Sequence, residues 1–163
     1  MQAYQETLLL EYGLDNLSTQ QKNDVYTYMA SMLGKAIPDV SYTDALEYYK
    51  NLKISDLSAS LDSQLAEGYT VTTNGKKYRL LSADMFNMLG LYVMNLNSTT
   101  PDTDTVMFYT ITDDKEISHT LTEFRNVCQE LFVYVKGIQS KFNTDRTNVK
   151  ACTTGVDVFA IKW

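Results

Sequence analysis

The sequence predicts an α+β fold, in which a helical N-terminal lobe precedes two β-hairpin–helix units, a long C-terminal helix and a terminal strand. Up to residue 67, apolar residues recur at the spacing of amphipathic helices. From residue 69 the pattern alternates and then returns to helical spacing, and this change occurs twice. We therefore expect a helical lobe over residues 1–67 and a hairpin–helix–hairpin–helix domain with a C-terminal strand over residues 68–163.

Helix start and stop signals divide the N-terminal lobe. The first helix is expected over Met1–Tyr12, with Gly13 ending it. Ser18 and Gln21 have the spacing of a capping box, and Gly34 is placed to end the helix that follows.

Two further helices are expected before the first strand. Ser41 or Thr43 can cap one of them. Ser55 then opens another, in which Leu57, Leu61 and Leu65 lie four residues apart, and Gly68 ends it.

Asn74-Gly75 predicts a tight first hairpin, because a type I′ turn needs positive φ at both central residues. With these two residues as the loop, the expected pairs are Thr73 with Lys76, Val71 with Tyr78, and Tyr69 with Leu80. This register gathers the apolar side chains of Tyr69, Val71, Tyr78 and Leu80 on one face.

The helix after the first hairpin is expected to begin at Ser82, with Asp84 in its first turn. Its predicted buried stripe consists of Met85, Leu89, Tyr92 and Leu96.

The second hairpin is expected to turn at Thr112–Lys115. A three-residue loop, which we favour, pairs Ile111 with Ile117, Tyr109 with His119, and Met107 with Leu121. A two-residue loop would instead pair Thr110 with Ile117, and it would bury less apolar surface.

The last helix is expected to be the longest. Thr120 with Glu123 forms a capping-box pattern, and Thr122 is the alternative cap. A heptad-like seam follows at Phe124, Cys128, Leu131, Val135, Ile138 and Phe142. Residues 156–163 then read as a terminal strand that docks on this chain or on a neighbour.

Composition narrows the function classes. A hydrophobic content of 44% supports a packed core, and a net charge of −6 without a basic cluster argues against nucleic acid or an anionic membrane as the main partner. The sequence offers no apolar run of transmembrane length and no signal-peptide pattern at its start. We therefore expect no export by the standard route.

Candidate catalytic residues are few, and we expect a non-enzymatic protein without metal or cofactor. His119 is the only histidine, which excludes sites that need several imidazoles. A nucleophilic pair with Cys128 is conceivable, but Cys128 lies in the helix seam, so we expect reduced, packed thiols at Cys128 and Cys152. The turn carboxylates Asp102, Asp104, Asp113, Asp114 and Glu116 lack the spacing of a calcium loop and read as solvated turn residues.

Aromatic residues are the main candidates for an interface, since the chain has 12 tyrosines and only 21% charged residues. Tyrosine is enriched at protein interfaces, although several of these side chains could equally lie at the edge of the core. The candidate interface residues are Tyr26, Tyr28, Tyr48, Tyr49, Val156, Val158, Phe159, Ile161 and Trp163.

The second half of the chain resembles a domain of unknown function found in tailed-bacteriophage proteins associated with tail fibres and baseplates. The matching positions are 75–78 (Gly-Lys-Lys-Tyr), Ser82, Asp113-Asp114, Leu121-Thr122, Phe124 and 148–151 (Asn-Val-Lys-Ala). Phe108-Tyr109 stands where that domain usually has a tryptophan, and residues 1–67 have no counterpart in it. The resemblance carries no catalytic residues over to this chain.

The resemblance implies a structural component of a tailed-phage virion, first of all at the tail or its fibres, made in the host cytoplasm. Its expected partners are other virion proteins, including copies of itself, with no nucleic acid, membrane or small-molecule substrate. The alternatives are a head–tail ring or adaptor protein, an acidic intracellular inhibitor of a host enzyme, and an enzyme of unknown chemistry.

Overall fold

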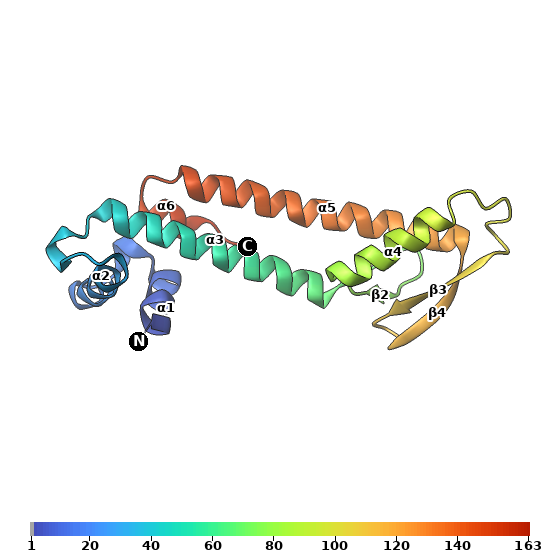
Figure 1. Ribbon diagram of the computed structural model, residues 1–163, viewed down its shortest axis with the longest axis horizontal. Coiled ribbons are helices and arrows are strands. Elements are labelled where there is room, and N and C mark those ends of the chain that lie inside the picture. The colour runs from blue at the N-terminus through green and yellow to red at the C-terminus, as the bar shows by residue number, and fades with distance from the viewer. Residues whose placement is uncertain (1) are drawn as a thin grey trace. The chain divides into compact units, whose positions relative to one another are not determined.

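The computed structural model describes residues 2–163, with side chains from residue 4, and its helices and two antiparallel hairpins confirm the expected α+β class (Figure 1). The chain divides into two compact units. Unit 1 consists of residues 1–60 together with 141–163, and unit 2 consists of residues 61–140. The C-terminal segment therefore belongs with the N-terminal helices, although the sequence pattern grouped it with the hairpins.

Unit 1 is helical. Its elements are α1 (Gln2–Tyr12), η1 (Leu14–Asn16), α2 (Thr19–Leu33), η2 (Ile37–Asp39), the first part of α3 (Tyr42–Glu67), the end of α5 (Leu121–Ala151) and α6 (Gly155–Ala160). Its core includes Leu9, Leu14, Val25, Met29, Tyr49, Leu57, Val149 and Val158.

The predicted helix caps of unit 1 are confirmed. The Ser18 hydroxyl accepts from the Gln21 N–H, and the Ser18 N–H donates to the Gln21 side chain at 2.9 Å. Gly34 ends α2 in the left-handed region at φ 61°. Ser41, rather than Thr43, caps α3, because its hydroxyl accepts from the Asp44 N–H at 3.1 Å.

The prediction that Ser55 opens a separate helix is wrong, since α3 runs unbroken from Tyr42 to Glu67. Ser55 is exposed in the middle of that helix. A serine whose side chain faces solvent is tolerated there, and no glycine or proline between residues 42 and 67 interrupts the helix.

The predicted C-terminal strand is also wrong, because Gly155–Ala160 forms helix α6. The Thr154 hydroxyl accepts from the Asp157 N–H at 3.2 Å, and the Asp15 carboxylate accepts from the Val156 N–H at 2.7 Å. A Cβ at Gly155 would come within 2.8 Å of both Leu14 and Asp15, so α6 packs closely on η1. This cap and this close contact favour a helix, although the alternating apolar residues Val156 and Val158 predict a strand.

Unit 2 contains both hairpins and the helices that cover them. Its elements are the end of α3, β1 (Tyr69–Thr70), β2 (Lys77–Tyr78), α4 (Ser82–Met94), β3 (Thr105–Thr110), β4 (Lys115–Thr120) and most of α5. Its core includes Val71, Tyr78, Leu80, Met88, Phe108, Leu121, Phe124, Cys128 and Leu131.

The first hairpin pairs Tyr69 with Tyr78 and Thr70 with Lys77, so its predicted register is wrong. A four-residue loop, 72–75, replaces the predicted two-residue turn, and the Val71 N–H donates to the Lys76 carbonyl at 3.0 Å. The register has shifted by two residues, an even number, which leaves each side chain on its predicted face. Tyr78 and Leu80 are accordingly buried, as expected.

The second hairpin also has a four-residue loop, 111–114, and it pairs Phe108 with Ile117 and Val106 with His119. Neither predicted register is right. The shift from the favoured register is odd, so β3 buries Val106, Phe108 and Thr110, while Met107 is exposed. The fourth loop residue has positive φ in both hairpins, 69° at Gly75 and 50° at Asp114. The two hairpin loops thus have the same length and a positive φ at the same position, although their sequences predict turns of different length.

The start of α5 and its seam are confirmed, whereas the predictions for α4 are wrong in two respects. Thr120 caps α5, since its hydroxyl accepts from the Glu123 N–H at 3.2 Å. Leu81, not Ser82, stands at the N-cap of α4. The buried side of α4 is centred on Met88, while Leu89 and Leu96 of the predicted stripe are exposed.

Changing Gly68 to Ala should destabilise unit 2, because Gly68 has φ 83° and a Cβ there would lie 2.3 Å from the Tyr78 carbonyl oxygen. We expect a loss of more than about 2 kcal/mol in the free energy of unfolding, as left-handed backbone and a steric clash add together. Urea denaturation followed by circular dichroism measures it. The control is Gly137→Ala in α5, where a Cβ meets no described atom within 4 Å. It should stabilise by about 0.5–1 kcal/mol, and equal effects of the two substitutions would contradict the prediction.

Candidate functional site

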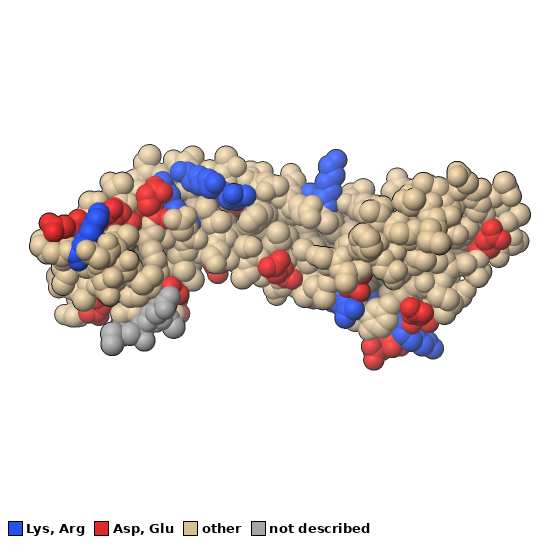
Figure 2. Space-filling model, in the orientation of Figure 1, with Lys and Arg blue, Asp and Glu red and all other residues tan. Residues whose placement is uncertain are grey.

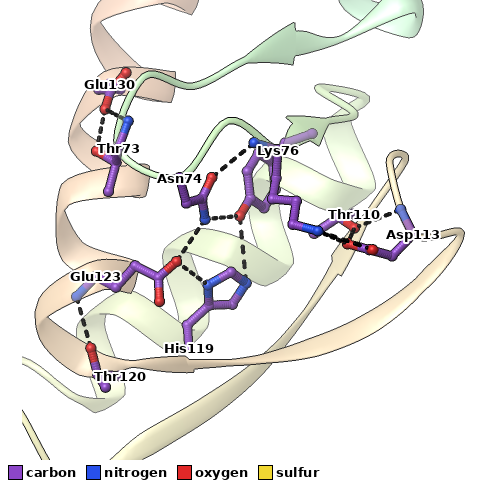
Figure 3. Close-up of polar contacts among 10 residues, drawn as sticks. Thr73, Asn74, Lys76, Thr110, Asp113, His119, Thr120, Glu123 and Glu130 are labelled. Carbon is purple, nitrogen blue, oxygen red and sulfur yellow. Dashed lines mark hydrogen bonds and ion pairs between the residues drawn. The ribbon is translucent and has the colours of Figure 1, made fainter.

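The single histidine lies in a buried polar cluster between the first hairpin loop, β4 and α5 (Figure 3). His119 is 1% exposed, with its Nδ1 3.2 Å from Glu123 Oε1 and its Nε2 3.5 Å from the Tyr78 hydroxyl. The Nδ1 contact has ion-pair distance but lacks the direction of a hydrogen bond. Asn74 Nδ2 donates to the Tyr78 hydroxyl at 2.8 Å and to Glu123 Oε1 at 2.7 Å.

This cluster holds the first hairpin loop in place. Burial raises the pKa of Tyr78 to about 12, so its hydroxyl stays protonated near neutral pH. General acid–base catalysis needs a proton-transfer group within reach of a substrate, and His119 is closed off by its own neighbours. The cluster ties the first loop to β4 and α5.

Glu130 holds the other side of the same loop, one heptad beyond Glu123 on α5 (Figure 3). Its carboxylate accepts from the N–H groups of Thr72 and Thr73, at 2.7 and 2.9 Å, and from both threonine hydroxyls. The Thr73 hydroxyl, followed by the other donors, lowers the pKa of Glu130 from 4.5 to about 2. We call the contacts of Glu123 and Glu130 with this loop the α5 clamp.

The turn carboxylates are engaged by side chains of their own turns, of the other hairpin or of α5. Asp113 accepts from Lys76 at 2.9–3.0 Å and from the Thr110 hydroxyl at 2.9 Å (Figure 3). Asp102, Asp104 and Asp114 accept from Thr122, Ser98 and Tyr109 at 2.6 Å. Glu116 is exposed on β4. Within residues 2–163 no group of three or more His, Cys, Asp or Glu is placed to hold a metal ion.

Both cysteines are free thiols. Cys128 is fully buried in the core of unit 2, and burial raises its pKa to about 12. Burial and the nearby Asp157 also raise the pKa of Cys152, which is partly buried. The nucleophile is the thiolate, so neither site favours thiol chemistry at neutral pH.

Two lysines of α3 are nearly buried, and each has an acidic partner. Lys50 lies 2.8 Å from Glu47, and Lys53 lies 3.6 Å from Asp56. Burial lowers the pKa of Lys53. Lys50 Nζ also donates to the Lys150 carbonyl at 3.3 Å, which joins α3 to the end of α5 within unit 1. We interpret both as core-edge residues whose ammonium groups are satisfied.

The candidate interface tyrosines lie around the core of unit 1. Tyr49 is fully buried and therefore belongs to that core. Tyr26, Tyr28 and Tyr48 are partly buried against it. Tyr48 donates to Glu6 at 2.8 Å and meets Tyr28 edge-to-face at 6.0 Å. Their role at an interface stays a prediction.

The C-terminal candidates are held within unit 1. Val158 is fully buried, and Ile161 and Trp163 pack against the core. Lys141 lies 4.6 Å from the centre of the Trp163 ring, and Lys162 lies 3.8 Å from that of Phe159. Val156 is exposed. Since this segment is helical up to Ala160, it does not present the extended strand expected to join a neighbouring sheet.

The sequence reading missed an exposed apolar surface on α4 and the turn that follows it, formed by Phe86, Leu89, Val93, Met94 and Leu96, which we call the α4 face. Phe86 is 79% exposed and Met94 is 82% exposed. Figure 2 shows a broad uncharged area over α4. The available signal was that α4 is apolar on all sides, with Asp84 as its single charged residue. Met88, Leu91 and Tyr92 take the side toward the core, which leaves the α4 face outward.

A groove of about 410 Å³ adjoins the α4 face within unit 2. It is lined mainly by apolar side chains, including Leu65, Leu80, Met85, Phe86, Phe132 and Val135. Phe86 and Leu89 belong to both the groove and the α4 face. The groove and the α4 face together form a candidate binding surface within unit 2.

The chain matches no protein-family model, no curated protein and no solved structure. Within residues 2–163, no helix has the length and apolar character required to cross a membrane. The function must therefore be inferred from the surface and the buried groups themselves.

Acid should release the first hairpin loop from α5. Because folding lowers the pKa of Glu130 from 4.5 to about 2, its contribution to stability is present above about pH 4.5 and is lost as the pH falls towards 2. NMR shifts of the Thr72 and Thr73 amide protons should report this loss. In Glu130→Gln the two amides should already be shifted at pH 7. Glu116→Gln, at an exposed position of β4, is the control and should behave like the unmodified chain.

Native Cys128 should resist thiol reagents at pH 8. Its side chain is fully buried and its pKa is about 12, so both access and thiolate are lacking. We expect iodoacetamide, followed by mass spectrometry, to label Cys152 slowly and Cys128 only after unfolding. Fast labelling of native Cys128 would contradict this prediction and would support a nucleophilic role for this thiol.

Proposed function

We propose that this chain is a non-enzymatic docking protein and a structural component of a tailed-phage virion, at the tail or its fibres. The observation that carries the docking role is the α4 face, an exposed, apolar and uncharged surface on α4 and the turn that follows it. Exposed patches of this kind typically mark protein–protein contacts in soluble proteins. The resemblance to the phage tail-associated domain supports the virion role.

The buried groups support a binding role over catalysis. His119 and Cys128 are enclosed, and Asp102, Asp104 and Asp114 accept hydrogen bonds from neighbouring side chains of this chain. The net charge of −6 disfavours binding to a phosphate backbone. The surface available to a partner is therefore mainly apolar. The groove beside Phe86 gives this surface a shape that a partner can complement.

Quantitative mass spectrometry of purified particles tests the virion role. If the proposal holds, this chain is present in a fixed ratio to the major tail proteins and stays in the particle after a high-salt wash, because apolar contacts are not screened by salt. Absence from washed particles, together with abundance in the infected-cell extract, would favour the inhibitor alternative and contradict the proposal.

Substituting one exposed valine tests whether α4 is the docking surface. Val93→Lys places a charge in the α4 face, whereas Val133→Lys makes the same change on the exposed side of α5. The two valines are 56% and 67% exposed, so neither change opens a cavity. We expect Val93→Lys to lower the copy number of the chain per particle by at least about ten-fold and Val133→Lys to leave it unchanged. Equal incorporation of both variants would rule out α4 as the docking surface.

A further inference from the structure

Four of the five residues of the α4 face have a spacing that reads the same in both directions. Phe86, Leu89, Val93 and Leu96 are separated by three, four and three residues. Spacings of three and four place Phe86, Leu89 and Val93 along one stripe of α4, as in the seam of a helix pair. Leu96 follows in the turn after the helix, where its N–H donates to the Val93 carbonyl at 3.3 Å. An antiparallel second copy of α4 would meet this stripe in register, with Phe86 opposite Leu96 of the second copy and Leu89 opposite its Val93.

The area of the α4 face suits an interface between two copies. The exposed fractions of its five residues amount to about three fully exposed large side chains. At ~200 Å² for each, this is on the order of 600 Å², at the upper end of the largest patch on a typical monomer. A standard interface buries ~800 Å² on each partner, so the α4 face and its polar rim approach what a stable dimer needs.

Charge favours a second copy over a partner that is selected by charge. Residues 85–101 contain no charged side chain. At the start of the helix, Arg79 neutralises Asp84 through two hydrogen bonds of 2.8 and 3.0 Å. Two copies that each carry −6 repel one another in general, and an uncharged face is where they meet with the least repulsion.

We propose that the chain forms a symmetric homodimer in which the α4 faces of two copies pack antiparallel about a twofold axis near Leu91. This inference rests on the proposed docking function and names the occupant of the docking surface. A twofold interface uses the same patch on both copies, which the palindromic spacing provides. The side chain of Phe86 stands at the edge of the groove, where the second copy's helix would cover it.

Sedimentation velocity of the full chain over about 1–300 µM tests the dimer, since interfaces of this size commonly bind in the micromolar range. We expect a concentration-dependent dimer for the unmodified chain. Val93→Lys should weaken the dimer by at least about a hundred-fold, because it places two ammonium groups in an apolar interface. Val133→Lys should leave it unchanged. Circular dichroism should show all three proteins equally helical, since lysine is at least as good a helix former as valine.

Mixing two variants tests the register. Leu89→Glu and Val93→Lys should each be monomeric alone, whereas an equimolar mixture should dimerise, because the new carboxylate of the Leu89→Glu copy would face the new ammonium group of the Val93→Lys copy. Mixing Leu89→Glu with Val133→Lys is the control, in which only the Val133→Lys homodimer should form and Leu89→Glu should stay monomeric. Failure of the first mixture to associate more than Leu89→Glu or Val93→Lys alone would overturn the antiparallel register.

An unmodified chain that stays monomeric throughout the concentration range would overturn the homodimer. In that case, lower incorporation of Val93→Lys into particles would show that the α4 face serves another protein, and the docking function would stand. A dimer that Val93→Lys does not weaken would equally overturn the proposal, because the copies would then meet elsewhere. The failure of the inference and the failure of the proposed function are thus separate results.

Discussion

The α5 clamp is the contact on which the arrangement of unit 2 depends. The first hairpin pairs only two residues on each strand, and a hairpin this short is not stable by itself in water. Glu123 and Glu130, one heptad apart on α5, hold its loop through Asn74, Thr72 and Thr73. The hairpin thereby keeps Tyr78 and Leu80 in the core, and the chain that leaves it begins α4 directly afterwards. The outward direction of the α4 face follows from this placement.

Local signals in the sequence were sufficient for most helix ends and for the α5 seam, because capping depends on a few neighbouring residues. Ser18, Gly34 and Thr120 are examples. The hairpin registers could not be predicted from neighbouring residues, because they depend on contacts far away in the sequence. The Thr72 and Thr73 backbone bonds to Glu130, 57 and 58 residues away in sequence, favour a wider loop over the tight turn that Asn74-Gly75 suggests. The same limit applies to residues 155–160, where contact with Asp15 near the other end of the chain favours a helix.

The candidate site was missed for a related reason. A helix that is apolar on all sides offers several stripes of similar hydrophobicity, and periodicity alone does not decide which one is buried. In α4 the choice depends on contacts outside the helix. Arg79 holds Asp84 near its start, and Arg125 donates to the carbonyls of Asn95 and Leu96 just beyond its end. The prediction of a non-enzymatic protein, by contrast, depends on residue types alone, and it stays a prediction.

The division of the chain has a consequence for the order of events during synthesis. Unit 2 is one continuous segment, whereas unit 1 needs residues from both sides of it. A ribosome therefore releases all of residues 61–140 before it makes α6, whose Val158 joins Leu14 and Tyr49 in the other core. Domains fold largely as they emerge. Unit 2 can therefore fold first. Unit 1 is completed later, when residues 141–163 pack against the helices of residues 2–60.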